Sequence, residues 1–203
     1  MKKREVSLAL NMLLIIFECI GFILSIAEYN TIHFEYYTED SNFIALIASL
    51  TFIIFMGINK KVPRLVSIFK YISNICLTLT CFVVIFILLP MYDYDFAMLL
   101  FDGPILYHHL LCPIISLISF FFYDDLGKLT KSDSIKGMSF TILYGLVLIP
   151  LNIFLIVEGP YPFLMVRDQS IVVSIFWMIL LLSLVGLISY VLRKLYLKHN
   201  YRG

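Results

Sequence analysis

Residues 6–27 read VSLALNMLLIIFECIGFILSIA, an apolar run with one acidic residue, Glu18. A helix of about 20 residues crosses the roughly 30 Å hydrocarbon core of a bilayer. Because backbone groups in lipid must be hydrogen-bonded within their own segment, a run of this length predicts a membrane-spanning helix. The run is too long for the apolar region of a signal peptide, so we expect it to be retained.

Five further apolar runs of similar length follow along the chain. They extend over residues 41–58, 68–89, 105–123, 138–157 and 170–192. Hydrophobic residues make up 61% of the chain, and the gaps between the runs are too short to hold a water-soluble domain. Residues 1–203 are therefore predicted to form a single all-α domain, a polytopic membrane protein with six transmembrane helices.

Charge is distributed unequally between the gaps. Fourteen of the 15 Lys and Arg residues are assigned to alternate gaps, where they form four clusters: Lys2, Lys3 and Arg4; Lys60, Lys61, Arg64 and Lys70; Lys128, Lys131 and Lys136; Arg193, Lys194, Lys198 and Arg202. Arg167 alone falls in one of the other gaps, which are acidic. The positive-inside rule therefore predicts that both termini are cytoplasmic. A basic inner face favours anionic lipid as a partner rather than nucleic acid.

Composition also bears on location. Abundant Ile, Lys, Asn and Tyr in a simple six-span layout favour a bacterial source, and hence an integral protein of the bacterial plasma membrane. The sequence carries no signal for an oligomeric state.

Polar residues gather toward the acidic side of the predicted bundle. Thr38 lies at the outer entrance to the second span, and His108 and His109 lie about one turn into the fourth span. Glu18 occupies the outward half of the first span. An ionised carboxylate there costs several kcal/mol unless it is paired or faces water, so Glu18 is expected to have a partner or carry a proton.

A hydroxyl, an imidazole and a carboxylate at one depth are the components of a nucleophilic hydrolase. A threonine hydroxyl needs an adjacent base to accept its proton during attack, and either His108 or His109 could be that base. Asn42, Tyr37 or free amides at the start of the second helix are candidate donors to an oxyanion. No histidine and carboxylate pair has metal-ligand spacing on one helix, so we expect neither metal nor cofactor.

The connection between the fifth and sixth runs is unusually apolar. Residues 158–164 read EGPYPFL, and we expect this segment to fold back over the bundle, with Tyr161 and Phe163 near a substrate pocket. An interfacial aromatic belt is the alternative interpretation. Asn152, in the fifth span, is a further candidate pocket residue, with a helix–helix hydrogen bond as its alternative role.

Three motifs together resemble those of the androgen-induced-gene family of six-span membrane proteins and its bacterial relatives. They are YYTEDSN at 36–42, HHLLCP at 108–113 and YPFL at 161–164, and their order and span placement match as well. That family includes transmembrane threonine hydrolases of fatty acid esters of hydroxy fatty acids. The resemblance assigns the nucleophile to Thr38 and the base to His108, with His109 as the second choice, and it implies a hydrophobic ester substrate.

Two function classes follow. The first is a membrane hydrolase of lipid-like esters that uses Thr38 and His108, with orientation or oxyanion support from Asn42 and Glu18; acyl transfer to another alcohol is a variant of it. The second is a non-enzymatic carrier or lipid-binding protein in which Glu18, His108 and Asn42 form a polar site. In that case Thr38 would be an N-cap residue at a helix start.

Overall fold

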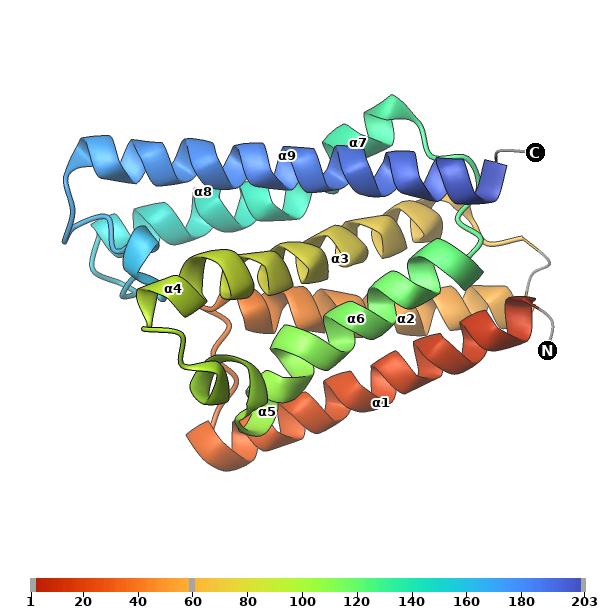
Figure 1. Cartoon of the computed structure of the whole chain (residues 1–203), viewed down its shortest axis with the longest axis horizontal. Coiled ribbons are helices and arrows are strands. Elements are labelled where there is room, and N and C mark those ends of the chain that lie inside the picture. The colour runs from red at the N-terminus through yellow and green to blue at the C-terminus, as the bar shows by residue number, and fades with distance from the viewer. Residues whose placement is uncertain (1–2, 59–60, 202–203) are drawn as a thin grey trace.

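The computed structural model describes residues 3–58 and 61–201, so Lys2, Lys60 and Arg202 of the basic clusters lie outside it. Within this part of the chain six helices are long and apolar enough to cross a membrane. They form one bundle with both termini at the same end (Figure 1). The predicted all-helical fold with six spans is confirmed for the described residues, which contain no strand.

Three spans are single helices: α1 (Lys3–Tyr29), α2 (Tyr37–Ile58) and α9 (Ile171–Tyr201). The third span comprises α3 (Arg64–Val83), the π-helix η1 (Val84–Leu88) and α4 (Leu89–Met91). The fourth comprises α5 (Gly103–Ile105), the π-helix η3 (Leu106–Leu111), α6 (Cys112–Ile118) and the π-helix η4 (Ser119–Tyr123). The fifth comprises α7 (Lys131–Gly137) and α8 (Ser139–Ile153). Two short helices lie in connections, the π-helix η2 (Ala97–Phe101) and the 3-10 helix η5 (Pro162–Leu164).

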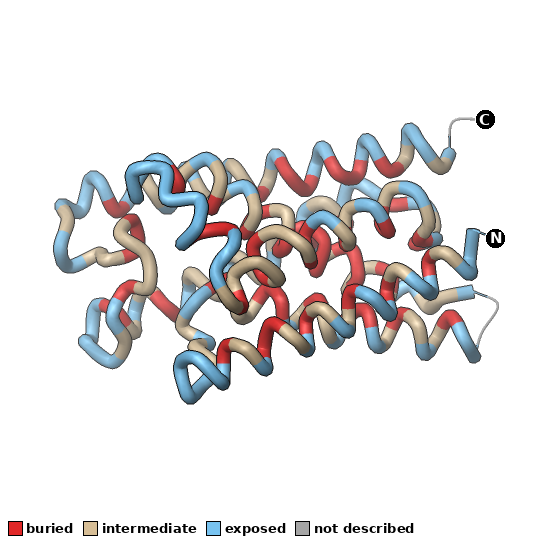
Figure 2. The backbone as a smooth tube through the Cα atoms, turned by 60° about the horizontal axis from the view of Figure 1, so that its bottom comes forward, coloured by how far each residue is buried: buried red, intermediate tan, exposed pale blue. Residues whose placement is uncertain are grey.

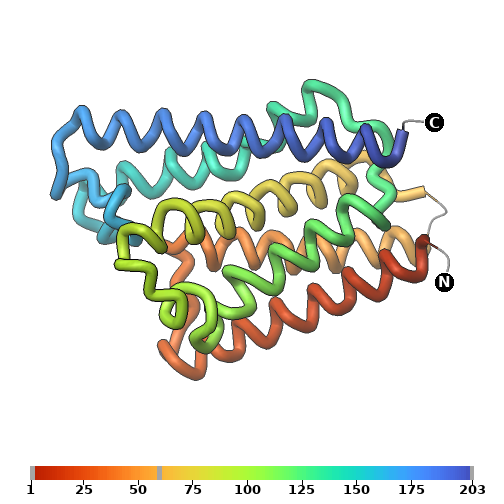
Figure 3. The backbone as a smooth tube through the Cα atoms, viewed as in Figure 1, coloured from red at the N-terminus to blue at the C-terminus, as the bar shows by residue number. Residues whose placement is uncertain are grey.

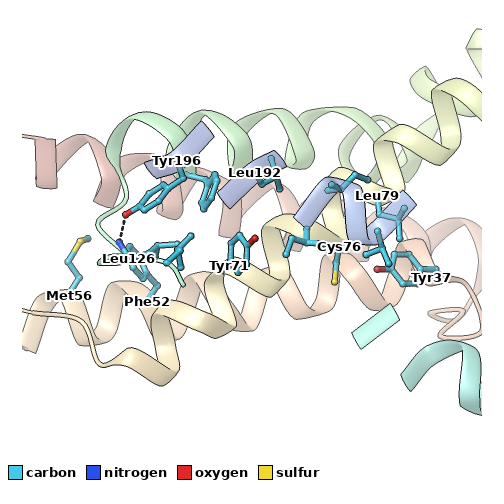
Figure 4. Packing of buried hydrophobic residues seen from close by; sticks show 14 residues of the cluster. Tyr37, Phe52, Met56, Tyr71, Cys76, Leu79, Leu126, Leu192 and Tyr196 are labelled. Atoms are coloured by element: carbon cyan, nitrogen blue, oxygen red, sulfur yellow. Dashed lines mark hydrogen bonds between the residues drawn. The ribbon is translucent and has the colours of Figure 1, made fainter. Parts of the chain in front are cut away.

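The fourth span crosses the bundle between α1 and α3, in contact with both (Figure 3). A cluster of buried apolar side chains follows α2 and α3 from Tyr37 to Met56, with Tyr71 and Cys76 between them (Figure 4). Near Met56 the Tyr196 hydroxyl of α9 accepts a hydrogen bond of 2.9 Å from the backbone N–H of Leu126. These contacts hold the ends of the helices in register, which fixes the depth of residues on different spans.

The outside of the bundle is apolar and much of its interior is polar. Many positions of α9 are exposed although they carry apolar side chains such as Ile171 and Leu187. In Figure 2 exposed and buried positions alternate along the part of this helix that leads to the C-terminus. Inside, the Asp124 carboxylate accepts hydrogen bonds from Ser7, Asn11 and Ser119 at 2.6, 2.9 and 2.8 Å. A surface of this kind suits lipid tails, and the internal hydrogen bonds join helices that have no hydrophobic driving force to associate there.

One charge assignment is wrong. The charge pattern assigns Lys70 to a loop, whereas the structure buries it completely inside α3. The helix begins at Arg64, so Lys70 lies about 9 Å along its axis at 1.5 Å per residue. Its Nζ donates a hydrogen bond of 2.8 Å to Ser49 on α2.

Several predicted span boundaries also need correction. The fifth span begins at Lys131 rather than 138, and the sixth ends at Tyr201 rather than 192. The second helix begins at Tyr37, not at residue 41, so Thr38 lies within it. The fifth span ends at Ile153 rather than 157, because Leu155 adopts a left-handed conformation with φ of 60° and turns the chain. Asn152 stabilises this turn by donating a hydrogen bond of 3.3 Å to the carbonyl of Val157.

The close packing of α7 against α3 and α9 gives a stability prediction. A Cβ at Gly137 would lie 2.4 Å from Ile75 Cδ1 and 2.7 Å from Ser189 Oγ, and both neighbours are fully buried. We expect Gly137→Ala to lower the unfolding temperature of the detergent-solubilised protein, since overpacking typically costs about 1–3 kcal/mol. Gly145→Ala is the matched control, because a Cβ there meets nothing within 4 Å. Equal unfolding temperatures for the two variants would contradict this packing.

Candidate active site

Three polar groups from distant parts of the chain meet at the start of α2. Thr38 is buried there, and its Oγ1 lies 3.3 Å from Nε2 of His109 on η3. The same Oγ1 lies 3.3 Å from the hydroxyl of Tyr161, in the connection between α8 and α9. The Thr38 side chain therefore contacts an imidazole and a phenol, and it makes no N-cap hydrogen bond among the described residues.

A widened helical turn presents His109. Pro113 has no N–H to donate to the carbonyl of His109, and its ring would clash with that carbonyl in a regular α-helix. The N–H of Cys112 donates instead to the carbonyl of Tyr107, five residues back. The same arrangement precedes Pro90, where the N–H of Leu89 donates to Val84. The result is a π-turn before Pro113, a feature that is frequent at functional sites.

The other nitrogen of His109 determines its protonation pattern. Nδ1 lies 2.7 Å from the carbonyl oxygen of Leu99 on η2. A carbonyl oxygen only accepts, so Nδ1 carries the hydrogen and donates it. In the neutral ring Nε2 is then an unprotonated acceptor, and it faces the Thr38 hydroxyl. The imidazole is therefore in the tautomer that a base toward Thr38 requires.

His108, the first choice for the base on sequence grounds, points elsewhere. Its Nδ1 lies 3.3 Å from Glu39 Oε1, and its Nε2 lies 3.9 Å from Glu18 Oε2. The ring packs 4.7 Å from that of Phe22 and so close to α1 that a Cβ at Gly21 would lie 2.2 Å from Nε2. The histidine that contacts Thr38 is thus His109, while His108 lies between the buried carboxylate of Glu18 and the partly buried carboxylate of Glu39.

Tyr161 is positioned to donate a hydrogen bond to the Thr38 hydroxyl. The backbone N–H of Thr38 donates to the Tyr161 hydroxyl oxygen at 3.3 Å, which leaves the Tyr161 hydrogen free to point toward Thr38 Oγ1. Burial raises the pKa of Tyr161 to about 12, so the phenol remains protonated at neutral pH. Its ring stacks on Phe163, with centroids 5.2 Å apart and the planes 7° from parallel.

The segment that carries Tyr161 folds back onto the bundle. Phe163 and Leu164 are buried against residues of η1, α4 and α8. Asn152 anchors the far end of the segment, since its Oδ1 accepts a hydrogen bond of 3.1 Å from the N–H of Val166. Asn152 therefore makes local contacts to this connection and does not itself join two spans.

The remaining candidates hold the site together. Asn42 donates to the carbonyl of Thr38 at 2.8 Å and to that of His108 at 3.2 Å, so it ties α2 to the π-turn and has no free donor. The Tyr37 hydroxyl lies 2.8 Å from Thr141 Oγ1 on α8, away from Thr38. Neither side chain presents a donor to the Thr38 hydroxyl, whereas the hydroxyl of Tyr161, expected only near a substrate pocket, contacts it.

An apolar cavity of about 300 Å³ borders the Thr38 and Tyr161 side chains. Its walls come from α2, the third span, α8, α9 and the segment around η5. Leu146 on α8 and Leu182 on α9 line it and are also exposed on the outside of the bundle. The cavity therefore reaches the apolar outer surface of the bundle between α8 and α9.

Within the described residues, no group of three or more His, Cys, Asp and Glu side chains is arranged to hold a metal ion. No protein-family model, curated protein or solved structure matches the chain.

The tautomer of His109 can be measured. With ¹⁵N-histidine-labelled protein at neutral pH, we expect the His109 signals to show a protonated Nδ1 and an unprotonated Nε2, because Leu99 accepts from Nδ1. Loss of one set of signals in His109→Gln would assign them. A proton on Nε2 in the neutral ring would contradict the geometry, since Nε2 could not then accept from Thr38.

Proposed function

We propose that the protein is a membrane-embedded hydrolase of lipid-like esters, with Thr38 as the nucleophile and His109 as the base. The observation that carries the proposal is the contact of the Thr38 hydroxyl with the unprotonated Nε2 of His109 beside an apolar cavity open to lipid. The resemblance of the motifs around Thr38, His108 and Tyr161 to the androgen-induced-gene family supports the same chemistry and points to fatty acid esters.

In the first half of the reaction, Thr38 Oγ1 attacks the ester carbonyl carbon while its proton passes to Nε2 of His109. The carbonyl oxygen becomes an oxyanion, toward which the Tyr161 hydroxyl donates a hydrogen bond. The N-terminal end of α2, with its partial positive charge, lies at the same place. Collapse of the intermediate breaks the bond to the leaving oxygen, which takes the proton from His109, and leaves an acyl-Thr38.

In the second half, water attacks the acyl group while His109 again accepts a proton. The tetrahedral intermediate then releases the fatty acid, and the proton returns to Thr38 Oγ1. If another alcohol replaces water, the same acyl-Thr38 supports acyl transfer. The Thr38 to His109 distance of 3.3 Å is long for a hydrogen bond but ordinary for a site without substrate.

The shape of the cavity favours a substrate with an apolar chain. Its wall beside Thr38 is formed by residues such as Leu79, Val83 and Leu148, which leave few polar groups to bind a hydrophilic ester. The opening between α8 and α9 gives lateral access from the membrane. Pockets of this size and character commonly bind small apolar ligands.

We further propose a cytoplasmic location for both termini and a bacterial plasma membrane as the host. The described basic residues of the predicted clusters, apart from the buried Lys70, gather toward the end of the bundle where the chain begins and ends (Figure 1). By the positive-inside rule this end faces the cytoplasm. Thr38, at the opposite end of α2, then lies in the outer half of the bilayer.

A non-enzymatic carrier is the second candidate, and one observation favours it. Among the described residues, both carboxylate oxygens of Glu18, Nε2 of His108 and Oε2 of Glu39 are buried without a hydrogen-bond partner, and Glu18 and His108 approach each other only to 3.9 Å. Buried ionisable groups that lack hydrogen bonds inside a membrane protein are characteristic of proton-binding and ligand-binding sites. Transport through this set would depend on Glu18 and His108 and would tolerate substitution of Thr38.

Hydrolysis of a fluorogenic long-chain acyl ester by purified protein separates the candidates. We expect Thr38→Ala to abolish turnover, Thr38→Ser to retain part of it, and His109→Gln to lower it by about 10²–10⁴-fold, as loss of a general base does. His108→Gln should lower it less, because His108 does not contact Thr38.

Thr51→Ala is the control, since Thr51 lies on the same helix and its hydroxyl donates, within the described residues, to carbonyls of its own helix. Turnover is compared among variants whose unfolding temperatures equal that of the parent. Equal turnover in the parent, Thr38→Ala and Thr51→Ala would contradict the enzyme and favour the carrier.

A further inference from the structure

A second cavity lies at the other end of the bundle from Thr38. It has a volume of about 530 Å³ and is enclosed by the starts of α1 and α3, the end of α2 and the segment that follows η4. In Figure 1 these elements meet at the end that carries both termini. The cavity is thus separate from the proposed active site in both position and residues.

The lining of this cavity is strongly cationic. Five basic side chains and one carboxylate, Asp125, contribute to it; the basic residues are Lys3, Arg4, Lys61, Arg64 and Lys128. They come from three separate stretches of sequence, so the fold is what gathers them. Asp125 Oδ1 already accepts a hydrogen bond of 3.1 Å from the N–H of Gly127. The cavity therefore has an excess of positive charge, which favours the binding of an anion.

Two of the five cations have no protein partner within the described residues. The other three do: Lys3 donates to Asn200 Oδ1 at 2.7 Å, Arg4 donates to the carbonyl of Met56, and Arg64 pairs with Asp133. Lys61 and Lys128 are exposed at the rim of the cavity. Lys61 lies just before α3, and Lys128 lies in the segment that follows η4. Their ammonium groups are free to bind an anion between them.

The floor of the cavity differs from its rim. Phe52, Met56 and Leu126 are buried apolar residues at its base, and Ser67 contributes a small polar side chain. A cationic rim above an apolar floor matches a ligand with a phosphate at one end and a carbon skeleton at the other. Basic pockets between spans at the cytoplasmic surface are a known way of holding phospholipid headgroups.

We propose that this cavity binds a phosphate group that carries a glycerol-like or acyl part, with Lys61 and Lys128 as its principal free cations. The phosphate can come from the headgroup of an anionic phospholipid or from a soluble phosphate ester. Arg4 and Arg64 have guanidinium groups with five donors each, so they can bind a phosphate while keeping their protein partners. Lys side chains add point charges at the rim.

Native mass spectrometry of the full chain in detergent tests the proposal. The probes are dioleoyl phosphatidylglycerol, dioleoyl phosphatidylcholine with the same chains, and glycerol 3-phosphate as the headgroup alone. We expect the parent to bind phosphatidylglycerol in preference to phosphatidylcholine, and the preference to fall roughly tenfold in Lys61→Ala/Lys128→Ala. The matched control is Lys194→Ala/Lys198→Ala, which removes the same charge from exposed positions on α9 outside the cavity.

The arms of the experiment distinguish the two sources of phosphate. Selective phosphatidylglycerol binding that glycerol 3-phosphate does not displace supports a lipid ligand. Binding of glycerol 3-phosphate alone, lost in the same double variant, supports a soluble one. Equal losses in the two double variants, or no preference for either anionic probe in the parent, would overturn the site, because binding would then depend only on overall charge or be absent.

Discussion

The hydrogen bond from Nδ1 of His109 to the carbonyl of Leu99 is the interaction on which the proposed chemistry depends. It fixes the neutral tautomer and turns Nε2 toward Thr38. The carbonyl of Leu99 can accept this hydrogen bond because η2 packs against η3 of the fourth span and Leu99 is buried there. The π-turn before Pro113 completes the arrangement by presenting His109 to α2 and directing His108 toward the carboxylates of Glu18 and Glu39.

The membrane explains why the site takes this form. An apolar exterior leaves polar contacts as the means of joining spans specifically, and buried polar residues such as Asn42, Lys70 and Asp124 each link two elements. In a membrane, a buried polar group without a hydrogen bond is costly, so the carboxylate of Glu18, which accepts no hydrogen bond among the described residues, differs from this pattern. The proposed nucleophile and base are placed where the polar interior borders an apolar cavity that lipid can enter.

Much of the fold could be predicted from the sequence, because the bilayer imposes a length and a hydropathy that are visible residue by residue. The six spans could be predicted for this reason. Lys70 was misplaced because a charge count does not show whether a lysine near a helix start turns inward to a partner such as Ser49. The start of α2 at Tyr37 was missed because YYTEDSN is polar and shows no apolar run.

The site was predictable only in part, for a different physical reason. Composition and depth bring Thr38 together with a pair of histidines, but the choice between adjacent residues depends on the rotation of a helix. That rotation follows from the hydrogen bond that Pro113 cannot make and from the packing of His108 against Gly21. Leu99 offers no signal in sequence, since its role belongs to a backbone carbonyl, and Tyr161 is one of 13 tyrosines.

The most direct test of an activated Thr38 is covalent labelling of the purified protein with a fluorophosphonate probe, with the adduct mapped by mass spectrometry. The account predicts an adduct on Thr38 that is retained in His108→Gln and lost in His109→Gln, because His109 is the histidine of the pair whose ring contacts the Thr38 hydroxyl. Absence of any adduct on folded parent protein, with the probe active on a control hydrolase, would contradict the account, as would labelling of Thr38 that persists without His109.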